Sequence, residues 1–242
     1  MAFRKVDLHV HSPASSCHED RIMPEAGRFT SPRDIVEAAL AAGLGAVAIT
    51  DHNSVEGVAA IREAARDGLT VFPGAELATR GGHLLALFSV DASPPHLRRF
   101  IASLGFADQG VGDGFYQADI WLDEASRRIT EAGGLAIAAH ADRYSRGFLA
   151  GDESLADKAR MYRSPHLSAL EITLPKDKER WNRGLMPGYP LGRACIQGSD
   201  AHSTKEIGRR FTYIDFPEMS LNGLRRALEG YPERIRFPEE MP

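Results

Sequence analysis

Short apolar runs alternate along this chain with longer segments in which apolar residues recur at helical spacing. A short run rich in β-branched residues is typical of a buried strand, and an apolar repeat near 3.6 residues is typical of an amphipathic helix. The predicted strands are residues 5–10, 46–50, 70–76, 83–88, 135–140, 168–173 and 194–200. Strands that alternate with helices predict right-handed crossovers and a mostly parallel sheet.

Proline and glycine mark the ends of the predicted helices. Pro32 opens a helical repeat that Gly43 closes, and a second repeat spans residues 55–68. Residues 93–132 are expected to be mostly helical around a glycine-rich loop, and residues 176–183 are expected to form another helix. These helices supply the connections that a parallel sheet requires.

Seven predicted strands in a chain of 242 residues favour a distorted seven-stranded (β/α) barrel over an open sheet. We expect this α/β fold to form a single domain over residues 1–242, in which residues 217–242 supply a C-terminal helix and tail. The hydrophobic share of 43% and the charged share of 26% are ordinary for a globular protein. In such a barrel the active site lies at the C-terminal ends of the strands.

Histidines gather at the ends of the predicted strands. Seven of the nine lie at or beside these ends: His9, His11, His18, His52, His83, His140 and His202. Two carboxylates, Glu76 and Asp200, also end strands. His83 differs because it begins its strand, so it reaches the same face only if that strand runs antiparallel or the Gly81–Gly82 turn brings it back.

The spacing of these residues suits metal binding. Alternation along a strand places His9 and His11 on one face, where both can bind one ion, and Asp200 and His202 repeat that spacing. A single histidine at a strand end is more often structural, but the joint pattern favours a metal cluster. Imidazoles with a bridging carboxylate suit Zn²⁺, Mn²⁺ or Fe²⁺ better than Ca²⁺ or Mg²⁺, and two such ions can drive phosphoester hydrolysis.

Charge and cysteine content narrow the function further. The net charge of −4 and the pI near 6.1 argue against a tight, sequence-independent grip on nucleic acid. Two cysteines, Cys17 and Cys195, exclude a disulfide framework or a four-cysteine zinc site. The sequence shows no signal-peptide h-region and no apolar stretch long enough for a membrane span, so we expect a cytoplasmic location.

Six motifs carry a resemblance to a known family. DLHVHS, AITDHNSVEG, PGAE, the following His83, AIAAHADRY and GSDAHS occur in the order typical of the PHP (polymerase and histidinol phosphatase) superfamily. The resemblance runs from about Lys5 to Ile214, nearly the whole chain. It implies a distorted seven-stranded (β/α) barrel with two or three divalent metal ions and phosphoesterase activity.

The resemblance also implies a ligand set. His9, His11, Glu76 and Asp200 would hold the first ion, and Glu76 would bridge to a second ion held by His83 and His140. A third ion would be held by His52, His202 and a residue of the loop after the first strand. The chain departs from the family in that loop, which reads SPASSCHEDR. We favour His18 as the loop ligand, with Asp20 and Cys17 as competitors beside Glu19.

Two further residues are candidates for roles beside the ions. Asp51 precedes a ligand and is expected to orient it. Arg143, in AHADRY, resembles a phosphate-binding arginine of related phosphatases, although the other interpretation is a surface arginine in a loop. The chain lacks a G-x-S-x-G elbow and a glycine-rich P-loop, which argues against a serine hydrolase and a P-loop enzyme.

We therefore expect a metal-dependent phosphoesterase that hydrolyses a small phosphomonoester or nucleotide through a metal-activated water. One alternative is a phosphodiesterase or nuclease acting on nucleic acid ends, which the arginine pairs Arg98–Arg99, Arg127–Arg128 and Arg209–Arg210 leave open. Another is a non-catalytic PHP module, because the end of the chain resembles modules that precede a large ATPase domain. All the main ligand positions are filled, which argues against that second alternative.

Overall fold

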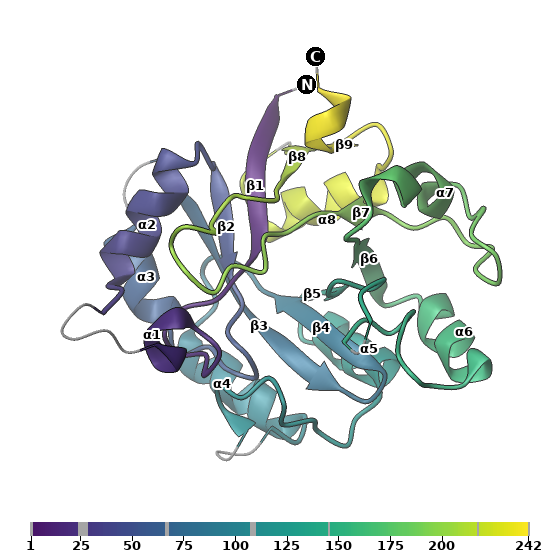
Figure 1. Ribbon diagram of the computed structural model, residues 1–242, viewed down its shortest axis with the longest axis horizontal. Helices are drawn as coiled ribbons and strands as arrows, with labels where there is room; N and C mark the ends of the chain where they lie inside the picture. The colour runs from purple at the N-terminus through teal and green to yellow at the C-terminus, as the bar shows by residue number, and fades with distance from the viewer. Residues whose placement is uncertain are drawn as a thin grey trace.

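One large, curved sheet dominates the computed structural model, which describes residues 2–23, 29–65, 68–106, 110–144, 146–216 and 218–241. Within these residues the sheet has nine strands in the order β7-β6-β5-β4-β3-β2-β1-β8-β9 (Figure 1). The strands are β1 (Phe3–Val10), β2 (Ala46–Ile49), β3 (Thr70–Thr79), β4 (Gly82–Leu87), β5 (Leu135–Ala138), β6 (Leu167–Glu171), β7 (Cys195–Ile196), β8 (Thr212–Asp215) and β9 (Ile235–Arg236).

The strand directions define a barrel-like sheet. Strands β1, β2 and β3 are parallel, as are β5, β6 and β7, while β4 runs antiparallel to both β3 and β5. The chain after β7 returns to β1, where Val10 pairs with Ala201 and the His11 N–H donates to the Ala201 carbonyl at 2.9 Å. This contact nearly closes the sheet, and the predicted (β/α) barrel is confirmed.

The strand count was too low by two. The prediction of seven strands covers β1 to β7, but β8 and β9 add antiparallel strands on the far side of β1. Strand β9 is only two residues long and lies in the expected C-terminal tail, where its sequence carries no apolar alternation. The single-domain assignment stays a prediction.

Helices surround the sheet (Figure 1). They are α1 (Glu19–Ile22), α2 (Pro32–Ala41), α3 (Val58–Ala64), α4 (Pro94–Ser103), α5 (Leu122–Glu131), α6 (Leu155–Arg163), α7 (Lys178–Asn182) and α8 (Leu221–Glu229). One apolar cluster joins the sheet to α2, α3, α4 and α5, and a second joins it to α8. None of the described helices is long and apolar enough to cross a membrane.

The hairpin between β3 and β4 brings His83 to the functional end of the sheet. Gly81 and Gly82 form its turn with φ angles of +95° and +133°, and a Cβ on Gly82 would lie 2.8 Å from the Phe148 backbone nitrogen. Glycine is required at such a position. Because β4 runs antiparallel, its first residues lie beside the C-terminal ends of the parallel strands.

Candidate metal centre

The carboxylate of Glu76, within β3, is fully buried and surrounded by five imidazoles. Its Oε2 lies 3.3 Å from His9 Nε2, 3.2 Å from His11 Nε2 and 3.0 Å from His52 Nδ1. Its Oε1 lies 2.8 Å from His83 Nδ1 and 2.9 Å from His140 Nε2. The two oxygens therefore face two different sets of histidines, as a carboxylate that bridges two ions would.

Three overlapping groups of side chains could each hold an ion. Ligand atoms within 4.8 Å of one another occur in three sets among the described residues: His9, His11, Glu76 and Asp200; His52, Glu76 and His83; and His11, Cys17, His52 and His202. His140 joins them through Glu76 Oε1. Eight of the nine predicted metal ligands thus lie together; His18 does not.

Neighbouring side chains orient the two histidines of β1. His9 Nδ1 lies 2.9 Å from Glu171 Oε2, and His11 Nδ1 lies 3.1 Å from Ser15 Oγ. Ser15 Oγ donates to Asp51 Oδ1 at 2.8 Å, so it accepts from the His11 Nδ1–H. Both histidines are therefore held with Nε2 toward Glu76, which is the orientation that a shared cation requires.

The sequence prediction missed Glu171, which lies at the end of β6. Its Oε2 also accepts from the His140 backbone N–H at 2.7 Å, so one buried carboxylate fixes two candidate ligands. The available signal was a single acidic residue inside the apolar run SALEIT. Asp7 is a second buried acid of this kind, and burial raises its pKa to about 6 while it accepts from the Ser199 and Gly208 N–H groups.

The backbone at two candidate ligands adopts the left-handed region. The φ angle is +30° at His140 and +53° at Asp200. Asn53, beside His52, has a φ angle of +51°. Such conformations cost of order 1–3 kcal/mol each in residues other than glycine. Strain of this kind concentrates at functional sites, where it aims a side chain that the regular strand would direct elsewhere.

Arg143 lies at the open side of the cluster. Its Nη1 donates to Asp200 Oδ2 at 2.6 Å, and its side chain is 44% exposed. A pocket of about 290 Å³ beside it is lined by both residues and by His140, Arg209 and Arg210, among others. A positively charged pocket that shares walls with the candidate ligands suits an anionic substrate.

Asp51 acts on the first loop rather than on a histidine directly. Its two oxygens accept from the Ser12 N–H at 2.7 Å, the Ser12 hydroxyl at 2.7 Å and the Ser15 hydroxyl at 2.8 Å. Ser15 Oγ in turn accepts from the His52 N–H at 3.1 Å. Asp51 therefore fixes the loop after β1 against the end of β2, which agrees with an orienting role.

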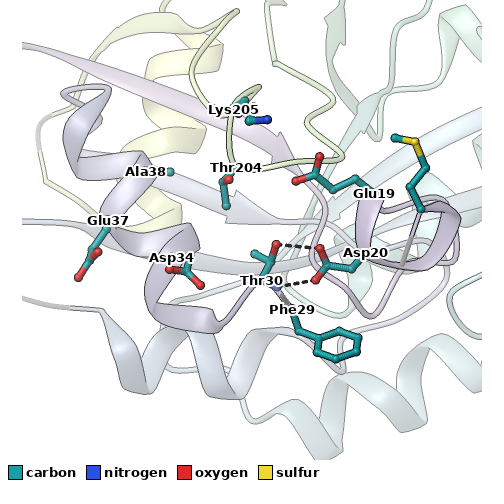
Figure 2. A pocket seen from close by; sticks show the side chains of 10 residues that line it. Glu19, Asp20, Phe29, Thr30, Asp34, Glu37, Ala38, Thr204 and Lys205 are labelled. Atoms are coloured by element: carbon teal, nitrogen blue, oxygen red, sulfur yellow. Dashed lines mark hydrogen bonds between the residues drawn. The ribbon is translucent and has the colours of Figure 1, made fainter. Parts of the chain in front are cut away.

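The same loop contains the four competitors for the third-ion ligand. The Nδ1 atom of His18 accepts from the Asp20 N–H at 3.3 Å and so caps α1. Asp20 binds Thr30 through both oxygens, in a pocket that Glu19 also lines (Figure 2). The Cys17 thiol lies with the histidines. His18 is in none of the three groups of possible ligands found among the described residues, and its assignment as the loop ligand stays a prediction.

The donor set and its unpaired atoms fit divalent cations. Among the described residues, buried atoms without a hydrogen-bond partner include Glu76 Oε2, His52 Nδ1, His83 Nε2 and His140 Nδ1. Leaving such atoms unpaired is costly in a folded protein. Burial opposes the charged form of Glu76, but the neighbouring imidazoles lower its pKa well below the usual range. A buried anion with several imidazoles is the environment that Zn²⁺, Mn²⁺ and Fe²⁺ prefer.

A barrel with a histidine and carboxylate cluster at its strand ends defines a metal-dependent hydrolase. The PHP domain model matches residues 7–165, and a PHP-associated model matches residues 191–230. Because the first match covers more than half of the chain, the protein belongs to the PHP domain family, and the resemblance seen in the sequence is confirmed. Metal-dependent hydrolases of phosphoric esters are among the members of this family.

Three individual proteins that match this chain are each less than 30% identical to it. The chain is 28% identical over 137 residues to uncharacterized protein MJ1587 of Methanocaldococcus jannaschii, a match that covers 56% of this chain and 67% of that protein. A crystal structure of endonuclease Q with a 27-mer duplex containing an abasic lesion has a TM-score of 0.73 and 19% identity. That match covers 96% of this chain but 58% of the endonuclease, so the chain spans little more than half of its length.

A protein from Bifidobacterium adolescentis that is described as a metal-dependent phosphoesterase also shares the fold. It has a TM-score of 0.57 and 21% identity, and the match covers 92% of this chain and 95% of that structure. At these identities the solved structures establish a shared fold.

The metal-free protein should lose stability as the pH rises from about 6.5 to about 9. Burial opposes protonation of His11, but the adjacent Asp200 and Glu76 carboxylates outweigh it and raise its pKa to about 9. A raised pKa contributes stability that is complete below the unfolded value of about 6.5 and is lost through the folded value. Thermal unfolding in a chelating buffer at several pH values measures this effect. A melting temperature that stays level or rises over this range contradicts it, and samples with added Mn²⁺ serve as the control.

Proposed function

We propose that the cluster holds two or three divalent ions and hydrolyses a phosphate ester of nucleotide size. The observation that carries this proposal is the buried Glu76 carboxylate, whose two oxygens face separate sets of histidines. In this assignment His9, His11, Asp200 and Glu76 would hold one ion, and Glu76 would share a second ion with His83 and His140. His52 and His202 belong to a third position.

Mn²⁺, Zn²⁺ or Fe²⁺ at these positions supplies Lewis acidity, which activates water and stabilises charge on the phosphoryl oxygens. The protein's own side chains orient the candidate ligands and balance the charges around them. Glu171 and the Asp51–Ser15 pair keep the Nε2 atoms of His9 and His11 directed at the site. Asp200, held in a left-handed conformation, directs one oxygen at His9 and His11 and the other at Arg143.

Arg143 is the proposed phosphate-binding group. Its guanidinium is anchored to Asp200 by one nitrogen, which leaves its other donors available to the neighbouring pocket. A guanidinium binds phosphate oxygens through charge-assisted hydrogen bonds in a fixed geometry. A phosphoryl group in that pocket would contact both this arginine and the ions.

Exposed aromatic rings beside the site favour a substrate with a base. Phe115 is 79% exposed and follows Gly114, which lies against the His52 ring. Tyr144 is 73% exposed and follows Arg143. The Arg146 guanidinium lies 4.5 Å from the centre of the Phe115 ring. Aromatic and guanidinium faces are the groups on which nucleic acid bases stack.

A nuclease acting on nucleic acid ends is the second candidate. Arg209 and Arg210 extend the lining of the pocket beyond Arg143, where the next phosphate of a strand would lie. The endonuclease Q structure, which shares this fold, contains a DNA duplex. The net charge of −4 favours the smaller substrate, because extended backbone contacts need more positive charge.

A regulatory PHP module within a longer chain that carries an ATPase domain is the third option. It is disfavoured because eight candidate ligands lie together and most of them are buried, whereas a module without catalysis has no need to retain them. The match of residues 191–230 to the PHP-associated model is compatible with either arrangement.

The purified protein should hydrolyse phosphate esters when supplied with Mn²⁺ or Zn²⁺. Matched phosphomonoester and phosphodiester nucleotide substrates distinguish phosphatase from nuclease activity. The double variant His9→Ala, His11→Ala removes two ligands of the first ion and controls for contaminating hydrolases. Turnover that is lost in the double variant supports the proposal. A folded, metal-loaded protein without turnover on either substrate would falsify it.

Substitution of Arg143 should impair use of the substrate while leaving the metal centre intact. Loss of one charge-assisted hydrogen bond, of about 1.5–3 kcal/mol, predicts a fall in kcat/KM of roughly ten- to a hundredfold for Arg143→Ala. Arg180→Ala, which removes an exposed arginine on α7, is the matched control. Unchanged kcat/KM with normal metal content shows that Arg143 is a surface residue with no part in binding.

A further inference from the structure

One of the four candidate donors in the loop between β1 and α1 is grouped with the histidines of the cluster. Of its four candidate donors, His18 caps α1, Asp20 binds Thr30, and Glu19 lines the pocket beside α2 (Figure 2). The Cys17 sulfur is grouped with nitrogens of His11, His52 and His202, all within 4.8 Å of one another. The thiol thus occupies the position for which the sequence favoured a neighbouring imidazole.

Backbone hydrogen bonds of the residues around Cys17 connect its loop to the segments that carry His52 and His202. The Ser16 N–H donates to the Gly112 carbonyl at 2.8 Å, and the Gly112 N–H donates to the His52 carbonyl at 2.8 Å. On the other side, the Glu19 N–H donates to the His202 carbonyl at 2.9 Å. The position of the thiol is therefore set by the same contacts that set the histidines.

Two histidines of this group, His11 and His52, are also possible ligands in the other two groups. His11 also belongs to the group with His9, and His52 also belongs to the group with His83. Cys17 and His202 occur in this group alone. Because a ring nitrogen binds one ion, these two residues define the position most clearly. His202 Nδ1 lies 2.7 Å from the Asp200 carbonyl, to which it donates, and this leaves Nε2 as the ligand nitrogen.

We propose that the Cys17 thiolate, with His202 and His52, forms a sulfur-containing position of the metal centre that takes Zn²⁺ or a similarly thiophilic ion in preference to Mn²⁺ or Mg²⁺. Thiolate and imidazole are ligands for zinc, whereas the oxygen-rich ligands of Mn²⁺ and Mg²⁺ are absent from this group. On binding, the sulfur–metal bond replaces the sulfur–hydrogen bond, and the proton leaves to solvent. This inference rests on the proposed metal centre, but its chemistry is independent of the hydrolytic step.

The two cysteines make the assignment testable by spectroscopy. Cys195 lies buried in β7 and belongs to none of the three groups found among the described residues, so it provides the matched control. Co²⁺ bound to a thiolate gives sulfur-to-cobalt charge-transfer absorption in the near ultraviolet, which Co²⁺ bound to nitrogen and oxygen alone lacks. The metal-free wild type is titrated with Co²⁺ beside Cys17→Ser, His18→Ala and Cys195→Ala.

The absorption should appear in the wild type, His18→Ala and Cys195→Ala, and should be absent from Cys17→Ser. Competition with a zinc chelator should show at least about a tenfold weaker affinity for one Zn²⁺ in Cys17→Ser, since even outer partners of a metal site cost that much. A further variant, Cys17→His, should keep the metal content and lose the absorption, which separates loss of the ligand from loss of the fold.

Absence of charge-transfer absorption in the Co²⁺-saturated wild type overturns the proposal. So does absorption that persists in Cys17→Ser and disappears in Cys195→Ala. Loss of bound metal in His18→Ala with Cys17 intact returns the ligand role to the histidine and also overturns it. The result is separate from catalysis: thiolate absorption without hydrolysis leaves the Cys17 site standing and removes the proposed function, and hydrolysis without thiolate absorption does the reverse.

Discussion

The burial of one carboxylate is the constraint on which this structure depends. Glu76 is wholly removed from solvent, and an isolated anion in that position would be prohibitively costly. Five imidazoles contact it, and neutral imidazoles alone do not balance its charge. Burial opposes protonation of His9 and His11, but the neighbouring carboxylates raise the pKa of both rings in the metal-free protein. Cations would supply the positive charge in the loaded protein. The strand ends are therefore organised around a charge that requires a positive partner.

The surrounding structure holds the imidazoles in place against local backbone preference. His140 and Asp200 adopt left-handed conformations, and Glu171, Asp7 and Asp51 are three further buried acids that bond to the backbone or to ligand rings. These contacts come from β1, β2, β6 and the segment after β7, so the site exists only when the barrel closes. Stability and metal binding are accordingly coupled, as expected where ligands are far apart in sequence.

The sequence predicted the parts of this arrangement that follow from periodicity. Strand ends, the shared face of His9 and His11, and the antiparallel route for His83 all follow from spacing and the Gly81–Gly82 turn. The choice among the loop residues does not follow from spacing, because backbone hydrogen bonds to Gly112 and His202 set how the loop lies against the cluster. Glu171 was missed because its partners, His9 and His140, are distant in sequence. The short strands β8 and β9 were missed because they are too short to show a periodic signal.

The most direct test of the central claim is the metal content of the Glu76→Gln variant, measured by mass spectrometry after dialysis against trace Mn²⁺ and Zn²⁺. The amide preserves the shape of the side chain but removes the charge that both candidate ion positions share. The account predicts that the variant remains folded and loses most of its bound metal relative to the wild type. Wild-type metal content in a folded Glu76→Gln protein would contradict a centre built on this carboxylate.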